Sequence, residues 1–252
     1  MRSSTKGCGA VGSEELRLQV AACTRLLHMQ GILGYSGHVS ARLGGGDSFL
    51  IQSFDDSRAE LLPERLLVAD LDGKPVHSAA SGKLPNEVTI HAEIYRHRPD
   101  VAAVVHMHPE LATVFTLVEG VRLQPMKMHA ARWADGIPVH PEPGHIKSQE
   151  QGRALARTLG DCHAVLLRAH GAVLVAESIP ALLVDSVHFE ENAKAQHLAA
   201  ALGTVVPLSA AELALLQANS NRAQHVAKLW SYYLRLGLGA GVVPTDWEPR
   251  LG

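Results

Sequence analysis

The feature that most constrains this chain is a pair of histidines, His106 and His108, at the end of an apolar run over residues 101–105. The run predicts a buried strand, and alternate residues of a strand share a face, so both imidazoles should point the same way. A third histidine, His170, lies within a second apolar stretch, 163–176, which predicts a hairpin or two strand ends. Three imidazoles are the usual number of protein ligands in a catalytic metal site that keeps a position open for substrate. The pattern therefore predicts a divalent-metal site.

Other readings of these side chains stay open on this pattern alone. The chain has 15 histidines, so an H-x-H pair is expected by chance, and the pair could simply be buried and hydrogen-bonded to the backbone. Glu87 lies on a predicted helix just before the strand and could supply a carboxylate beside the metal. It could instead only favour the first turn of that helix, where the dipole stabilises a carboxylate. His91, on the same helix, is predicted to pack or to support a ligand.

Composition narrows the class of protein. With 252 residues, 46% of them hydrophobic, the chain can bury a substantial core. Its 23 basic and 25 acidic residues give a net charge of -2, which argues against a nucleic-acid or membrane-surface partner. No apolar run approaches the roughly 20 residues of a membrane span. Residues 1–13 lack the apolar middle of a secretory signal and are predicted to form a flexible tail. Three scattered cysteines are typical of a reducing cytoplasm, the expected location.

Hydrophobic periodicity predicts one α/β domain over residues 14–252, with no linker, repeat or low-complexity segment. The expected helices are 14–30, 85–98, 180–201 and 209–236, and the expected strands before the hairpin are 38–43, 48–52, 66–71 and 101–107. The last helix should begin at the capping box formed by Ser209 and Glu212. Residues 124–140 are expected to be irregular. The three glycines at 44–46 precede a strand, so they predict a hairpin tip rather than a phosphate-binding loop.

Four sequence blocks, in order, carry a resemblance to a known family. They are GYSGHVSAR at 34–42, LLVADLDG at 66–73, PNE at 85–87 followed by IHAEIYRHRPDVAAVVHMHP, and LLRAHGAVL at 166–174. With these blocks the chain resembles the class II aldolase/adducin family over roughly residues 14–235. The resemblance implies a central, mainly antiparallel sheet flanked by helices, and a homotetramer with sites near subunit boundaries.

The same resemblance implies a site. The family's metal ligands fall on His106, His108 and His170, which would hold one divalent ion per subunit, zinc, manganese, cobalt or iron. The family's glutamate falls on Glu87, implied to act as acid and base and to ligate the metal when substrate is absent. Family precedent also leaves open whether a further group of side chains reaches a neighbouring subunit's site or closes a site: His129, Trp133, His140, His145, Tyr232 and Tyr233.

Three departures from the sugar-phosphate aldolases bear on the substrate. This chain has Gly37-His38 for Gly-Asn, Ser53-Phe54 for Thr-Gly or Ser-Gly, and Pro85-Asn86 for Ser-Ser. Those family positions surround a phosphate, whereas proline lacks an N–H donor and Phe54 adds bulk. A cationic or donating His38 would suit a carboxylate, and Phe54 could lie against a flat ring. The residues predicted to bind the second carboxylate or orient the ring are His38, Ser40, Arg42, Ser53 and Asn86.

The expected function is a divalent-metal-dependent lyase. The favoured reaction is decarboxylation of a hydroxylated aromatic dicarboxylate of the phthalate or pyridine type, as part of aromatic compound catabolism. A Lewis-acidic metal would stabilise the enolate left when carbon dioxide departs. One alternative is an aldolase that cleaves a non-phosphorylated hydroxy-keto acid or sugar. Another is a non-catalytic, adducin-like interaction protein, which would bind no metal.

Overall fold

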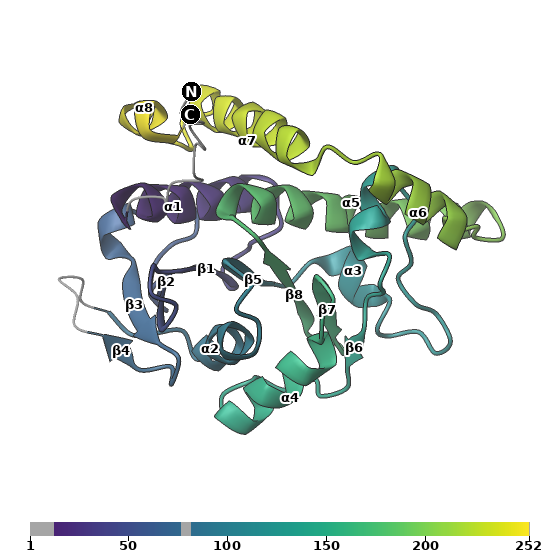
Figure 1. Cartoon of the computed structure of the whole chain (residues 1–252), viewed down its shortest axis with the longest axis horizontal. Helices are drawn as coiled ribbons and strands as arrows, with labels where there is room; N and C mark the ends of the chain where they lie inside the picture. The colour runs from purple at the N-terminus through teal and green to yellow at the C-terminus, as the bar shows by residue number, and fades with distance from the viewer. Residues whose placement is uncertain (1–12, 77–81, 252) are drawn as a thin grey trace, which may run out of the picture.

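A computed structural model describes residues 13–76 and 82–251, and its centre is an eight-stranded sheet in the order β4-β3-β2-β1-β5-β8-β7-β6 (Figure 1). Neighbouring strands are antiparallel except for β6 and β7, which are parallel. The strands are β1 (His38–Arg42), β2 (Ser48–Ile51), β3 (Leu67–Asp70), β4 (Pro75–Val76), β5 (Ala103–Met107), β6 (Val139–His140), β7 (Ala164–Leu167) and β8 (Gly171–Ala176). The predicted tail, 1–13, lies outside the described residues except for Ser13, which begins the first helix.

Helices cover both faces of the sheet (Figure 1). They are α1 (Ser13–Met29), α2 (Val88–His97), α3 (Glu110–Val114), α4 (Gln149–Leu159), α5 (Ile179–Leu202), α6 (Ala210–Ala218), α7 (Arg222–Gly239) and α8 (Glu248–Leu251), with short 3-10 turns η1 (Pro63–Arg65), η2 (Met128–Trp133) and η3 (Thr245–Trp247). No helix within the described ranges has the length and apolar character to cross a membrane.

Alternation along β5 decides which layer each side chain joins. Val105 and Met107 belong to the hydrophobic cluster that contains α1, α5 and α7. Val104 belongs to the second cluster, formed by α2 and α4 on the opposite face. Because side chains two apart in a strand share a face, His106 points to the α2 side with Val104.

The structure differs from the sequence-based elements in several places. The single helix expected at 209–236 is two helices, interrupted at residues 219–221, where the Asn221 side chain accepts from Gln224 N and begins α7. The helix expected from Pro85 begins at Val88, with Glu87 at its N-cap position. Helix α4 was not predicted, although Ser148 and Gln151 form a capping box at its start. The predicted hairpin over 163–176 is confirmed as β7 and β8.

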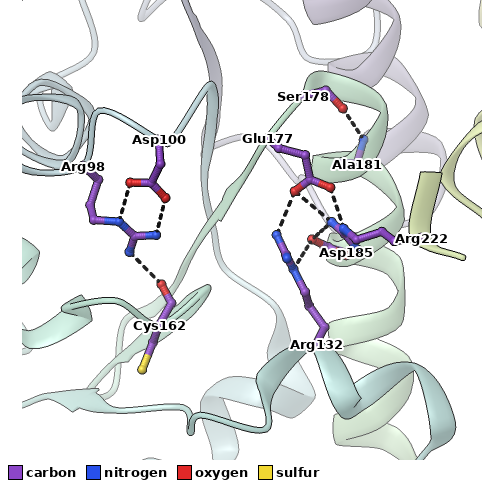
Figure 2. Close-up of polar contacts among 9 residues, drawn as sticks. All are labelled: Arg98, Asp100, Arg132, Cys162, Glu177, Ser178, Ala181, Asp185 and Arg222. Atoms are coloured by element: carbon purple, nitrogen blue, oxygen red, sulfur yellow. Dashed lines mark hydrogen bonds and ion pairs between the residues drawn. The ribbon is translucent and has the colours of Figure 1, made fainter. Parts of the chain in front are cut away.

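A group of four charged residues fastens α7 to the rest of the domain, as the right half of Figure 2 shows. Asp185 of α5 is 3% exposed and accepts from Arg132 Nε of η2 at 3.1 Å and from Arg222 Nη2 of α7 at 2.7 Å. Glu177, just before α5, accepts from both arginines. The guanidinium groups of η2 and α7 therefore share the same two carboxylates.

Candidate metal and acid-base site

The structure brings the three predicted histidines together at one end of β5. His106 lies in β5, His108 just beyond it, and His170 in the turn between β7 and β8. Their ring centroids are 4.7 Å apart for His106 and His108, 5.0 Å for His106 and His170, and 5.2 Å for His108 and His170. One nitrogen from each ring lies within 4.8 Å of the others. This spacing allows the rings to close around one cation.

The turn that presents His170 permits little variation. Ala169 has a φ of 56°, in the left-handed region that residues other than glycine rarely adopt. Its N–H donates to Thr116 Oγ1 at 2.9 Å. A Cβ on Gly171 would lie 2.3 Å from the carbonyl oxygen of Met107, so position 171, directly after His170, accepts no side chain. Backbone strain of this kind persists where the surrounding structure enforces it, and here it directs His170 toward β5.

Hydrogen bonds on the outer side of the rings orient the inner nitrogens. His106 Nδ1 lies 3.1 Å from the carbonyl oxygen of Ala172, which can only accept, so Nδ1 carries the proton. His108 Nδ1 lies 3.2 Å from Ser36 Oγ in a comparable contact. Supporting contacts of this type fix the tautomer and ring orientation of metal-binding histidines.

The inner nitrogens meet the requirement of a metal ligand set. His106 Nε2 lies 3.4 Å from Glu87 Oε2, and this contact is favourable only with a proton or a cation between the two atoms. Within the described ranges, His106 Nε2 and both ring nitrogens of His170 are buried without a hydrogen-bond partner. Buried polar atoms without partners are costly. Three imidazoles beside a carboxylate therefore fit a divalent metal ion.

Glu87 is held as an ionised carboxylate. Its side chain makes no cap bond to α2, although it occupies the N-cap position. Instead Oε1 accepts from Ile146 N at 2.9 Å, and Oε2 faces the histidines. Burial raises the pKa of this carboxyl, but a proton on His106 Nε2, which would donate to Oε2 and add positive charge, together with the Ile146 N–H and a protonated His170, brings it down to about 2.

His145 also lies beside Glu87 and His170. The sequence had left open whether this histidine reaches a site. Its Nδ1 lies 3.5 Å from Glu87 Oε2, and its ring centroid is 5.6 Å from that of His170. The side chain is 66% exposed, so it lies where the site meets solvent. No periodic pattern marks this loop, which is anchored by the neighbouring Ile146, a buried residue whose N–H donates to Glu87. His140 instead contacts Thr158 Oγ1, and Trp133 is in the core.

A buried chain of hydrogen bonds runs from the site into the layer beneath α2. His38 Nδ1 lies 2.6 Å from His91 Nε2, His91 Nδ1 lies 2.6 Å from Ser40 Oγ, and Ser40 Oγ lies 2.8 Å from Tyr95 Oη. Burial, together with the neighbouring His91 and His106, places the pKa of His38 well below its usual value. The cationic option for His38 is therefore disfavoured, and a neutral, donating ring is left.

These hydrogen bonds also bear on the roles predicted for two residues, Ser40 and His91. Ser40 is fully buried, and its hydroxyl contacts His91 and Tyr95, so it supports His91. His91 packs and orients His38, in line with its prediction as a supporting residue. Tyr95 was missed, yet the i, i+4 spacing of Glu87, His91 and Tyr95 marks one face of α2.

The other predicted substrate residues lie in different surroundings. Arg42 is at the far end of β1, where its guanidinium donates to four backbone carbonyls, those of Gly46, Tyr95, Arg98 and Val101. These bonds occupy the group that was expected to bind a carboxylate, so the structure does not bring Arg42 to the site. Ser53 is buried and accepts from Asp55 N at 3.3 Å. Asn86 is exposed beside Glu87.

Phe54 lies on the segment that follows Ser53 and is 44% exposed. Its N–H donates to the carbonyl of Lys83 at 2.8 Å, and the Lys83 ammonium lies 4.6 Å from its ring centroid. The loop at 53–55 therefore runs beside the segment that leads to Glu87. An unpredicted cation, Arg58, is buried nearby, donates to the carbonyl of Gly37 at 3.0 Å and helps to lower the pKa of His38.

Comparison with known proteins agrees with this arrangement. Residues 18–197 match the family described as Class II Aldolase and Adducin N-terminal domain. The chain belongs to the class II aldolase/adducin family. It is 30% identical over 185 residues to a 3,4-dihydroxyphthalate decarboxylase of Arthrobacter keyseri, covering 68% of this chain and 73% of the relative. For a protein of the same name from Rhodococcus jostii the identity is 30%, with 79% and 86% covered.

A solved aldolase II superfamily protein from Pseudomonas syringae has the same fold, with a TM-score of 0.81, 23% identity, and coverage of 96% of this chain and 99% of that one. The predicted family and its mainly antiparallel α/β fold are thus confirmed. Class II aldolase family members are lyases, decarboxylases or aldolases, that use divalent metals, and this chain carries a histidine triad that could hold one.

Proposed function

We propose that this lyase is a divalent-metal-dependent decarboxylase of a hydroxylated aromatic dicarboxylate. The observation that carries the proposal is the position of Glu87, whose Oε2 lies 3.4 Å from His106 Nε2 beside the histidine triad. The likeness to two 3,4-dihydroxyphthalate decarboxylases supports the aromatic substrate class. Pro85 and Phe54 support it further, because they remove an N–H donor and add bulk where sugar-phosphate aldolases have small polar groups.

The residues that would hold the metal are His106, His108 and His170. When bound there, a zinc, manganese, cobalt or iron ion would supply a Lewis acid that stabilises negative charge on the substrate's oxygens during cleavage of the C–C bond.

Glu87 has the position and charge to move the proton. As a carboxylate it can take the proton of the ring hydroxyl and deliver it to the ring carbon that bears the departing carboxylate. The C–C bond breaks, carbon dioxide leaves, and the new C–H bond keeps that proton, so one further proton must come from solvent to restore the hydroxyl. His145 is 66% exposed and 3.5 Å from Glu87 Oε2, a suitable path for that proton. The Ile146 N–H holds Oε1 throughout.

Substrate orientation falls to the groups around this centre. Neutral His38 keeps its Nδ1 on His91 and offers its remaining edge toward the side of His106, whose ring centroid is 5.3 Å away. The half-exposed ring of Phe54 offers a flat apolar surface for an aromatic ring. Ser53 and Asn86 remain candidates for the second carboxylate.

The test is a carbon dioxide release assay on purified, metal-loaded protein. The panel contains hydroxylated phthalates, hydroxylated pyridine dicarboxylates and an aliphatic 2-keto-4-hydroxy acid. We expect release from an aromatic diacid, lost in His106→Ala and retained in His197→Ala, a change at an exposed histidine of α5. Aldehyde formation from the aliphatic acid without carbon dioxide would establish the aldolase instead. A protein that binds no metal and turns over nothing would be of the adducin kind.

A further inference from the structure

A second group of three histidines lies away from the lyase site. His129 comes from η2, His188 from α5 and His225 from α7, and one nitrogen from each ring lies within 4.8 Å of the others. The rings of His129 and His188 are nearly parallel, with centroids 4.1 Å apart and planes at 9°. The centroid of His225 is 5.5 Å from His129 and 5.4 Å from His188.

We propose that His129, His188 and His225 form a second divalent-metal site, suited to zinc. Imidazole is a preferred ligand of zinc, and three imidazoles leave a fourth position of the tetrahedron for water or a small anion. The group shares no residue with the His106 triad. It is carried by the helices on the α5 face of the sheet, whereas His106 points to the α2 face.

The state of the ring nitrogens favours a cation. Within the described part of the chain, His225 Nε2 is buried without a hydrogen-bond partner. A buried ring nitrogen without a partner is costly, and a cation held by the three rings would supply the missing partner.

Charged neighbours do not oppose the cation. Lys127 and Glu191 form an ion pair of 2.9 Å beside His129 and His188, and their effects on the two rings have opposite signs. Arg132 and Arg222, in the same cavity, are already paired with Asp185. The local positive charges therefore have carboxylate partners of their own.

The cavity also provides room for the fourth ligand. All three histidines line an opening of about 610 Å³, together with Asn221 and Asp185. A metal there would join η2, α5 and α7, which ordinary packing and the Asp185 ion pairs already hold together. Since an ion that binds only the folded state stabilises it, zinc should raise the melting temperature through this site as well as through the first.

The experiment is a Zn²⁺ titration of the full chain, freed of metal beforehand, by competition with a chromogenic chelator and by elemental analysis after dialysis. Wild type should bind about two ions per chain, and His188→Gln, His225→Gln and His106→Ala about one each, as expected for two independent three-histidine sites. His106→Ala combined with His188→Gln should bind none. His197→Gln, an exposed position on α5, is the matched control and should bind as wild type does.

A readout other than stoichiometry separates the two sites. In His106→Ala, added Zn²⁺ should still raise the melting temperature, and that shift should vanish when His188→Gln or His225→Gln is added. Circular dichroism confirms that each variant is folded. The proposal fails if wild type binds one ion that is lost in His106→Ala, or if a second ion persists in both His188→Gln and His225→Gln.

Discussion

At the scale of single residues, the carboxylate of Glu87 is the group on which the proposed chemistry depends. Glu87→Gln keeps an oxygen for the Ile146 N–H, bonded at 2.9 Å, but cannot accept and return a proton. We therefore expect the turnover number for carbon dioxide release to fall about 10²- to 10⁴-fold, the usual contribution of a positioned acid or base. The measurement is initial-rate kinetics on the best substrate of the panel, with metal content determined on the same sample.

The metal content of Glu87→Gln decides how a lower turnover number is interpreted. Retained metal with lost turnover supports proton transfer, whereas loss of both would make Glu87 a ligand first. Undiminished turnover would remove Glu87 from the mechanism. Glu119→Gln, at an exposed glutamate that is not one of the site residues, is the matched control.

Sequence alone predicted which residues come together where their positions follow from period and block order. His106 and His108 were placed by the alternation of one strand, and His170 and Glu87 by their family blocks. Ser40 and Arg42, predicted to bind substrate, instead contact buried side chains and backbone carbonyls, because alternation gives the face of a strand but not the position along it. At about 3.3 Å per residue, Arg42 lies roughly 13 Å along β1 from His38, where it meets backbone carbonyls instead of a substrate.

At the scale of elements, the contact of β5 with the β7–β8 turn depends on Gly171. Gly171→Ala would place a methyl group 2.3 Å from the Met107 carbonyl oxygen, so the turn must move away from β5 and take His170 with it. Overpacking of this kind costs about 1–3 kcal/mol of unfolding free energy. We expect that loss in urea unfolding, together with weaker Zn²⁺ binding at the His106 triad.

A matched glycine change isolates this effect. Gly34→Ala adds the same methyl group where no atom lies within 4 Å, so stability and metal affinity should stay close to wild type. Equal behaviour of the two variants would show that the turn adapts freely and that the close approach of Gly171 to β5 is unimportant.

The ion pairs of Figure 2 make a separate element-scale prediction, for the attachment of α7. Arg222→Ala would leave Asp185, 3% exposed, with only Arg132 as a partner. Removing one partner of a fully buried pair costs about 3–5 kcal/mol. Because the Arg222 side chain is 29% exposed, we expect a smaller loss, about 2 kcal/mol of unfolding free energy.

Chemical denaturation measures the loss of unfolding free energy in Arg222→Ala and in a control variant, Arg250→Ala. Arg250→Ala removes an arginine whose partner, Glu14, is 80% exposed, and should cost less than about 1 kcal/mol. Equal costs for the two arginines would contradict the claim that burial of Asp185 gives the network its strength.

The missed elements show the limit of periodicity. Helix α4 carries Gly152 in its interior, which weakens a helical pattern. The structure shows why a glycine stands at position 152: a Cβ there would lie 2.7 Å from the carbonyl oxygen of Thr89 in α2. Conversely, the helical pattern continues through residues 219–221, so one helix was predicted where Asn221 caps a second. Both errors arise from tertiary contacts and capping that a hydrophobic pattern does not encode.

At the scale of the whole molecule, the two faces of the sheet carry different chemistry. The α2 face holds Glu87 and the His106 triad, and the α5 face holds the His129 group and the ion pairs that bind α7. The family blocks predicted the group on the first face because they contain Glu87 and the three histidines. The second arises from three segments far apart in sequence, none of which forms a recognisable motif by itself.

Buried neutral histidines on both faces predict how the stability of the whole molecule depends on pH. In the folded chain the pKa is about 3 for His91, about 4 for His163 and about 4 for His188, each below the usual 6.5 of a histidine because burial disfavours the charged ring. Below about pH 6.5 the unfolded chain therefore binds protons that the folded chain does not. The stabilisation that these neutral histidines give is complete above that pH and is lost progressively as the pH falls toward 4 and 3.

We accordingly expect the urea midpoint to fall between about pH 7.5 and about pH 5, with a chelator present so that metal release does not contribute; each proton taken up only by the unfolded chain lowers stability by about 1.4 kcal/mol per pH unit. His163→Gln removes one such group outside both triads, so its curve should be shallower than that of wild type, even if its stability at pH 7.5 differs. His197→Gln is the exposed control. A wild-type midpoint that stays constant over this interval would mean that the buried rings take up protons without unfolding, and the neutral state assigned to them would then be wrong.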